Sequence, residues 1–189
     1  MKILVTRHGQ TDWNLLKKVQ GHQDIELNEN GRNQAEKTRD SLSNEKIDLI
    51  ITSPLKRAKE TAEIINRNFN VNIIEDIRLI ERNLGRNSGL TKDEIKKLKE
   101  VHQEIKYIWD YEKNIEFNGI ERMHDMGKRV YDFLYEIIQK YSGKNILLVT
   151  HGGVSVFIEC YFKKYPLEEL HDRSVITGLD NCEVATYEV

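Results

Sequence analysis

The chain has 189 residues, of which 39% are hydrophobic and 32% are charged, a balance that is typical of a globular protein and excludes a disordered chain. Its formal net charge of −2 gives no overall attraction to nucleic acid or to an anionic membrane, so we expect neither as a partner. Two cysteines do not make a disulfide framework, and no apolar run suits a membrane span or a signal peptide. We therefore expect a cytoplasmic protein that folds as a single domain over residues 1–189.

Three short apolar runs predict strands in the first half of the chain, and helical patterns separate them. The strands are expected at residues 2–6, 47–51 and 71–74. The polar-rich pattern of residues 29–43 predicts a helix with Asn28 or Asn30 as its N-cap. A second helix is expected to have Ser53 as its N-cap and Pro54 in its first turn, where proline is tolerated.

The second half of the chain begins with an irregular stretch. Glycines interrupt residues 79–90, and Thr91 with Glu94 then makes a capping box that predicts a helix. The apolar face of that helix is expected to hold Ile95, Leu98, Val101, Ile105 and Ile108, and a further long helix to hold Met123, Met126, Val130, Phe133, Ile137 and Tyr141. The remaining predicted elements are a strand over 145–150, a helix over 153–162 and a β-rich segment over 174–188.

The alternation of strand and helix patterns predicts the fold class. Strands that alternate with helices form a mostly parallel sheet, because a parallel pair needs a crossover connection, and the crossover helices cover both faces. We therefore expect an α/β protein with three layers, an α/β/α sandwich in which helices flank the sheet. Residues 82–122 are expected to form a small helical cap.

Two histidines occur in similar settings near the two ends of the chain. His8 follows the apolar run at residues 2–6, and His151 follows the run at 145–150. A glycine comes directly after each of them. Ligands of open α/β sheets bind beyond the carboxyl ends of the strands. If these two strands are neighbours, both imidazoles meet in one site, and this pairing is the strongest functional signal in the sequence.

Three charged side chains follow the same strand-end logic. Arg7 directly precedes His8, and Arg57 lies near the start of the helix after the second strand. Glu81 follows the third strand after a short gap. Arginine presents a planar fork that matches phosphate oxygens, and helix N-termini add N–H donors. Two arginines, two histidines and one carboxylate at one sheet edge therefore predict a site for a phosphate ester of a small molecule.

Other phosphate chemistries lack their motifs in this sequence. A cysteine phosphatase needs an arginine six residues after its thiolate, but Pro166 follows Cys160 at that spacing. Glu188 follows Cys182 in the same way. No Gly-x-x-x-x-Gly-Lys-Ser/Thr loop and no His-Glu-x-x-His motif is present, which argues against a P-loop hydrolase and a zinc protease. The spacing of histidines and carboxylates suggests no metal cage, so we expect neither a metal nor another cofactor.

Five blocks of the sequence resemble the signature blocks of a known family, and they occur in that family's order. The blocks are residues 7–14, 19–28 with Gly31, 53–62, 79–82 with Gly85 and Gly89, and 149–153. Together they span most of the chain and resemble the histidine phosphatase superfamily, whose members are phosphoglycerate mutase-like. The resemblance implies a metal-independent phosphomonoester hydrolase that acts on small phosphorylated metabolites through a phosphohistidine intermediate.

The same resemblance implies roles for individual residues. His8 would be the nucleophile that accepts the phosphoryl group, and Glu81 would donate a proton to the leaving oxygen. The phosphate would be bound by Arg7, Arg57, His151, Asn14 and the N–H of Gly152, with Gln20 and Gly21 as loop contacts near the substrate. His8 must attack as a neutral imidazole, and we expect the two nearby arginines to lower its pKa.

Two alternatives remain open. Arg82 and Lys92 match positions that handle substrate in the family's mutases, so a 2,3-bisphosphoglycerate-dependent phosphoglycerate mutase is the first alternative. Leu84 stands where those mutases carry a tyrosine, and the segment after Glu81 is short for a mutase, whose longer insert helps to exclude water. The second alternative is a phosphate-binding module on a catalytically silent scaffold. Glu121 lies in an imperfect version of a Gly-Glu-Ser stretch of the family, which leaves its role open.

Overall fold

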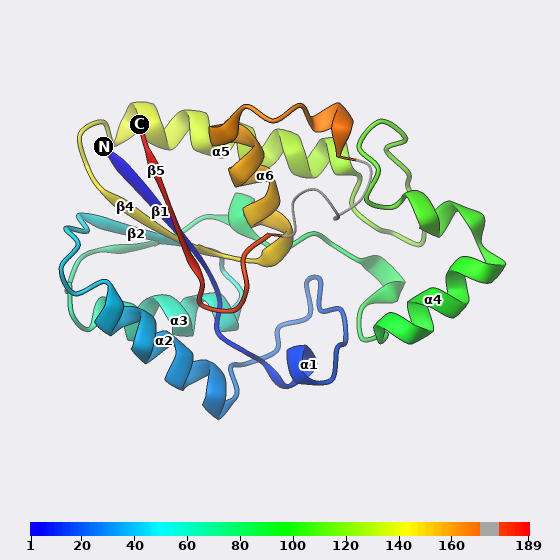
Figure 1. Cartoon of the computed structure of the whole chain (residues 1–189), viewed down its shortest axis with the longest axis horizontal. Coiled ribbons are helices and arrows are strands. Elements are labelled where there is room, and N and C mark those ends of the chain that lie inside the picture. The colour runs from blue at the N-terminus through cyan, green and yellow to red at the C-terminus, as the bar shows by residue number, and fades with distance from the viewer. Residues whose placement is uncertain (171–177) are drawn as a thin grey trace.

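The computed structural model describes residues 1–170 and 178–189, excepting the side chains of Lys92 and Ile105. Within these residues, five strands form one sheet in the order β3-β2-β4-β1-β5. The strands are β1 (Lys2–Arg7), β2 (Leu49–Thr52), β3 (Ile73–Glu75), β4 (Ile146–Thr150) and β5 (Val184–Glu188). The first four pair in parallel, and β5 pairs with β1 in the antiparallel direction at the edge of the sheet (Figure 1).

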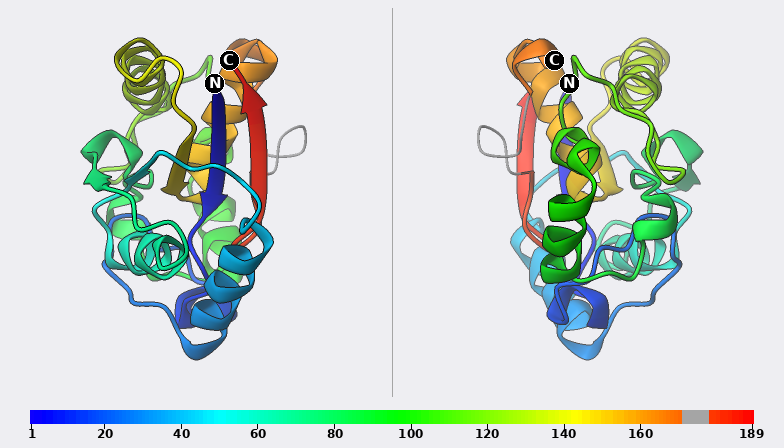
Figure 2. Two further views of the ribbon diagram at one scale, coloured as in Figure 1. Left: turned by 90° about the vertical axis from the view of Figure 1, so that its left-hand side faces the viewer. Right: turned by 90° about the vertical axis from the view of Figure 1, so that its right-hand side faces the viewer.

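Helices cover both faces of this sheet. They are α1 (Asp12–Leu15), α2 (Glu29–Ser41), α3 (Lys56–Asn66), α4 (Lys92–Val101), α5 (Met123–Lys140) and α6 (Gly152–Lys163). Helix α2 packs against α3 on one face, and α5 packs against α6 on the other (Figure 2). The fold is therefore the predicted three-layer α/β/α sandwich with a mostly parallel sheet.

Alternate side chains of β4 divide between two hydrophobic cores. Ile146 and Leu148 pack in the core that α5 and α6 complete. Leu147 and Val149 pack in the core that α3 completes. All residues of β4 are buried, because helices cover both faces of a parallel strand. His151 directly follows the carboxyl end of this strand, so the packing of the two cores fixes the position of His151.

The helix after β2 starts later than the sequence predicted, so the assignments of Ser53 as its N-cap and of Pro54 to its first turn are wrong. Helix α3 begins at Lys56 with Leu55 as its N-cap, and this residue has no side-chain oxygen to offer. Asp24 from another loop replaces it, because its carboxylate accepts a hydrogen bond of 2.7 Å from the Lys56 N–H. The Ser53 hydroxyl is thereby available for a contact within the site.

Residues 82–122 form the predicted small helical cap (Figure 1). Helix α4 has the predicted capping box, in which Thr91 and Glu94 each accept a hydrogen bond from the other's backbone N–H. The predicted apolar face does not continue past this helix, because the chain becomes extended after Val101, which is 75% exposed. A 3-10 turn at Gln103–Tyr107 follows, and the cap encloses a small hydrophobic core of its own.

The ends of the remaining elements agree with the sequence in part. Asn28 caps α2 as predicted, and its side chain accepts a hydrogen bond of 2.9 Å from the Gly31 N–H. Of the predicted β-rich segment 174–188, strand β5 occupies Val184–Glu188, and residues 174–177 lie outside the described residues. In the part of the chain that the structure describes, no helix has the length and apolar character needed to cross a membrane.

Candidate active site

The carboxyl ends of β1, β2 and β4 meet at one edge of the sheet. Arg7 at the end of β1 pairs with Thr150 at the end of β4, and β4 also pairs with β2. His8 and His151 follow β1 and β4 directly, and the centres of their rings lie 5.2 Å apart. The two neighbouring strands therefore bring both imidazoles into one site, as the sequence led us to expect.

The ring of His8 is held in one tautomer. Its Nδ1 lies 2.7 Å from the carbonyl oxygen of Gly9, and since a carbonyl only accepts, Nδ1 carries the proton and Nε2 keeps a free lone pair. Burial, followed by the charges of Arg57 and Arg7, lowers the pKa of His8 well below its usual value. His8 is thus neutral near pH 7, and burial lowers its pKa more than the arginines that the sequence had suggested.

His151 is fully buried next to His8 and is fixed by Ser53. Its Nε2 lies 2.7 Å from the Ser53 hydroxyl, which comes directly after β2. Burial is the largest cause of a pKa well below the usual value for His151, and Arg57 adds to it. Sequence reasoning missed the role of Ser53, although its position after a strand is the same signal that identified the histidines.

Arg57 holds the loop that borders the site. It is fully buried in the first turn of α3 and donates hydrogen bonds of 3.0 Å to the Gly21 carbonyl and 2.7 Å to the Gln23 carbonyl. Burial lowers the pKa of Arg57 to about 10, so it stays charged at neutral pH. Gly21 has a φ of +53°, and a Cβ there would lie 3.0 Å from the backbone nitrogen of Leu84, so the loop needs glycine at this point.

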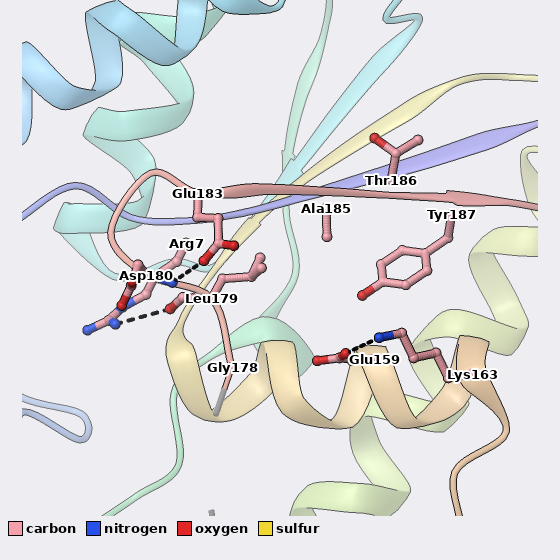
Figure 3. Close-up of a pocket in the computed structure, with 10 residues that line it drawn as sticks. All are labelled: Arg7, Glu159, Lys163, Gly178, Leu179, Asp180, Glu183, Ala185, Thr186 and Tyr187. Atoms are coloured by element: carbon pink, nitrogen blue, oxygen red, sulfur yellow. Dashed lines mark hydrogen bonds and ion pairs between the residues drawn. The ribbon is translucent and has the colours of Figure 1, made fainter. Parts of the chain in front are cut away.

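A segment near the C-terminus supports the end of β1, and sequence reasoning did not connect it with the site. Arg7 donates a hydrogen bond of 3.1 Å from Nη1 to the Leu179 carbonyl (Figure 3). Asn181 donates one of 2.8 Å from its side-chain amide to the His8 carbonyl. Gly178 lets this segment approach the start of α6 closely. Its φ is +72°, and a Cβ there would lie 2.4 Å from the carbonyl oxygen of Gly152.

The carboxylate of Glu81 is fixed by two backbone N–H groups. Its Oε1 accepts a hydrogen bond of 2.9 Å from Arg82, and its Oε2 accepts one of 3.2 Å from Gly153 in the first turn of α6. The Thr150 hydroxyl donates to the Leu79 carbonyl at 2.9 Å and ties this loop to the end of β4. Glu81 therefore reaches the site with its carboxyl group already oriented by the backbone at the start of α6.

Glu121 and Arg129 form a largely buried ion pair behind Glu81. Arg129 donates from Nε to Glu121 Oε1 at 2.6 Å and from Nη2 to Glu121 Oε2 at 3.0 Å, a bidentate geometry. The same Nη2 lies 3.4 Å from the Glu81 carbonyl, and Glu121 Oε2 also accepts from the Asn83 N–H at 3.1 Å. The pair thus holds the backbone of both Glu81 and Asn83.

Glu121→Gln is expected to lower kcat by about tenfold, because it leaves the buried Arg129 charge without its partner and loosens the backbone of Glu81. KM should change much less, since Glu121 does not line the pocket. Steady-state kinetics with one ester checks both values. Glu116→Gln is the matched control, because Glu116 makes an exposed ion pair with Arg122 on the same segment. A lowered melting temperature with unchanged kcat would contradict a positioning role.

A pocket of about 390 Å³ lies at the carboxyl edge of the sheet. Among the residues expected in the site, those that line it are Arg7, His8, Asn14, Gln20, Gly21, Arg57, Glu81 and Arg82. The pocket is also lined by residues that sequence reasoning did not select, namely Lys17, Lys18, Val19, Leu84, Trp109, Asp180 and Asn181. Most of this second group lies in loops with no periodic pattern, so only the tertiary structure identifies them.

Other residues expected in the site are placed differently. Arg82 lies in the pocket wall, and its guanidinium donates to the carbonyls of Glu121, at 2.8 Å, and of Ile108, so it ties distant parts of the cap together. Gly152 is the first residue of α6, and the side chain of Lys92 lies outside the described residues. Within the described ranges, no group of three histidine, cysteine or acidic side chains is arranged to hold a metal ion.

Comparison with known proteins gives consistent matches. A family model for the histidine phosphatase superfamily (branch 1) matches residues 3–189. The chain is 37% identical over 151 residues to the Bacillus subtilis protein named "Uncharacterized phosphatase PhoE", which covers 80% of this chain and 72% of that relative. It is 32% identical over 184 residues to the 2,3-bisphosphoglycerate-dependent phosphoglycerate mutase of Allorhizobium ampelinum, which covers 94% and 86%. The solved structure of Bacillus stearothermophilus YhfR matches with a TM-score of 0.87 and 32% identity, over 100% and 91% of the two chains.

Proposed function

This chain belongs to the histidine phosphatase superfamily, and we propose that it is a metal-independent phosphomonoester hydrolase that acts through phospho-His8 on small phosphorylated metabolites. The observation that carries this proposal is the His8 ring. The hydrogen bond of 2.7 Å from Nδ1 to the Gly9 carbonyl leaves Nε2 as a neutral nucleophile that borders the pocket. Phosphatase names among the relatives support the reaction class.

In the first step, the lone pair of His8 Nε2 attacks phosphorus, and the bond between phosphorus and the ester oxygen breaks. Glu81, in its protonated form, gives its proton to the leaving alcohol. Negative charge spreads over the phosphoryl oxygens in this transfer, and the fixed guanidinium groups of Arg7 and Arg57 stabilise it there. The products of this step are the alcohol and phospho-His8.

In the second step, water attacks the phosphorus of phospho-His8 and the bond from nitrogen to phosphorus breaks. The Glu81 carboxylate takes a proton from this water, which restores its acid form for the next cycle. Inorganic phosphate leaves, and neutral His8 is regenerated. The covalent intermediate thus divides one difficult displacement into two easier steps.

Hydrolysis of p-nitrophenyl phosphate is expected to proceed unchanged in excess EDTA, because Arg7 and Arg57 provide the positive charge that a metal would otherwise supply. Release of nitrophenolate measured with and without chelator checks this. A quench in alkaline detergent, followed by release of the protein-bound phosphate on acid treatment, tests the covalent step. Activity that is lost in EDTA and restored by a divalent cation would overturn the metal-independent proposal.

A mutase is the second candidate, and the similarity to 2,3-bisphosphoglycerate-dependent phosphoglycerate mutases over 94% of this chain favours it. A mutase must keep water from its phosphoenzyme. The cap here contains one helix of ten residues and short 3-10 turns, which supports hydrolysis instead. Incubation with 3-phosphoglycerate and a trace of 2,3-bisphosphoglycerate separates the two reactions. Free phosphate supports the hydrolase, and 2-phosphoglycerate without free phosphate supports the mutase.

A further inference from the structure

We infer that the pocket is selective for phosphomonoesters whose alcohol part carries a second anionic group, and that Lys17 and Lys18 bind this group at the pocket rim. The inference rests on the proposed phosphatase function and specifies its substrate class. It is built on three observations: the charge of the pocket lining, the exposure and backbone of the two lysines, and a buried amide oxygen beside them.

The pocket lining holds more positive charge than one phosphate group needs. Five cationic side chains and two carboxylates border it. Arg7 and Arg57 are the cations whose charges act on His8, where the phosphate would bind. Burial lowers the pKa of Arg7, and the charges of Glu81 and Asp180 counter this effect, so both carboxylates act on Arg7, although Asp180 itself is exposed. With five cations against two carboxylates, a phosphate dianion bound to the two arginines still leaves positive charge in the lining unmatched.

Lys17 and Lys18 supply that positive charge. Lys17 is exposed and Lys18 is half-buried, whereas His8 and Arg57 are buried, so the lysines lie at the rim. Among the described residues, neither lysine makes an ion pair. Lys18 contributes to the lowered pKa of Glu94, but the Glu94 carboxylate already accepts hydrogen bonds from the backbone N–H and the hydroxyl of Thr91. Both ammonium groups can therefore bind an anion from the substrate.

The backbone holds these lysines in place. Lys17 has a φ of +55°, a left-handed conformation that asparagine or glycine adopts more readily, so the fold alone does not favour lysine here. Lys18 forms a backbone bridge with Thr91, the N-cap of α4 in the cap, and its ammonium lies 5.8 Å from the centre of the Trp13 ring. The rim is thus built by a loop that the cap fixes, and it presents two adjacent positive charges.

Gln20, two residues after Lys18, adds a polar group to the pocket lining. Its side chain lines the pocket and the residue is 8% exposed, yet its Oε1 has no hydrogen-bond partner among the described residues. A buried carbonyl oxygen without a donor is unfavourable, so a hydroxyl or ammonium hydrogen of the substrate would satisfy it. The pocket therefore matches an alcohol part that carries both an anionic group and a hydrogen-bond donor.

Phosphate release from matched pairs of esters tests the inference. In the first pair, 3-phosphoglycerate carries a carboxylate where glycerol 3-phosphate carries a hydroxymethyl group. In the second pair, 1,3-propanediol bisphosphate carries a second phosphate that the monophosphate lacks. We expect kcat/KM to be about tenfold higher for the anionic member of at least one pair, and the pair that shows it identifies the second group as carboxylate or phosphate.

Lys17→Asn and Lys18→Gln remove the rim charges with little strain, because asparagine accepts the backbone of Lys17. The ratio of the two kcat/KM values is expected to fall about tenfold in the double variant and to stay unchanged in Lys37→Gln, an exposed lysine of α2 away from the pocket. A wild-type ratio near one, or a ratio that the double variant keeps, would overturn the inference. Absence of any ester hydrolysis, p-nitrophenyl phosphate included, would instead overturn the phosphatase function itself.

Discussion

His8→Asn is expected to reduce phosphatase turnover by about 10⁴-fold or more and to abolish the acid-labile phosphoenzyme. The asparagine amide can still donate to the Gly9 carbonyl, as Nδ1 does at 2.7 Å, but it has no counterpart of Nε2. His8→Ala should be equally inactive. Stopped assays with p-nitrophenyl phosphate measure turnover, and equilibrium binding of inorganic phosphate shows that the site is still formed.

His151→Asn provides the comparison, because a second neutral imidazole lies 5.2 Å from the first. The Nε2 of His151 lies 2.7 Å from the Ser53 hydroxyl, and His151 is not among the residues that line the pocket, so His8 is better placed to attack the substrate. We therefore expect His151→Asn to retain a phosphoenzyme, formed more slowly. If His8→Asn still forms a phosphoenzyme and His151→Asn does not, then His151 is the nucleophile and the proposal for His8 is wrong.

The inner part of the site was predictable from the sequence because its residues follow buried strands. A parallel strand covered on both faces is a continuous apolar run, and its carboxyl end is therefore visible in the sequence. His8 and His151 were found in this way. Ser53 carries the same signal after β2, but it was interpreted as a helix cap, because a serine before proline is also a normal start of a helix.

The outer part of the site was not predictable in this way. Arg129 lies on the long helix α5, where it looks like any surface cation until the fold places it against Glu121. The segment at Leu179 reaches Arg7 from the other end of the chain, and no local pattern indicates a contact across 172 positions. The rim lysines lie in a short loop without periodicity. Such contacts depend on the relative placement of elements, which single-sequence patterns do not specify.

Arg57→Ala is expected to lower kcat/KM by about 10³-fold, because it removes a fixed charge that stabilises the transferring phosphoryl group. It should also lower the free energy of unfolding by about 2 kcal/mol, since the buried Gly21 carbonyl loses its donor at 3.0 Å. Arg57→Lys keeps the charge but cannot make both hydrogen bonds, to the carbonyls of Gly21 and Gln23. We therefore expect kcat/KM and stability between those of the wild type and of Arg57→Ala. Arg32→Ala, which removes an exposed arginine paired with Glu60, should behave like the wild type.

The pH dependence of the Arg57 variant distinguishes its electrostatic effect from its effect on the loop. The charge of Arg57 is the second largest cause, after burial, of the low pKa of His8. Removing that charge raises this pKa, so a larger fraction of His8 is protonated and unreactive at any acidic pH. The acid limb of kcat/KM should therefore move to higher pH in Arg57→Ala and stay near its wild-type position in Arg57→Lys. An acid limb that is the same in all three proteins would mean that Arg57 acts only through the loop that it holds.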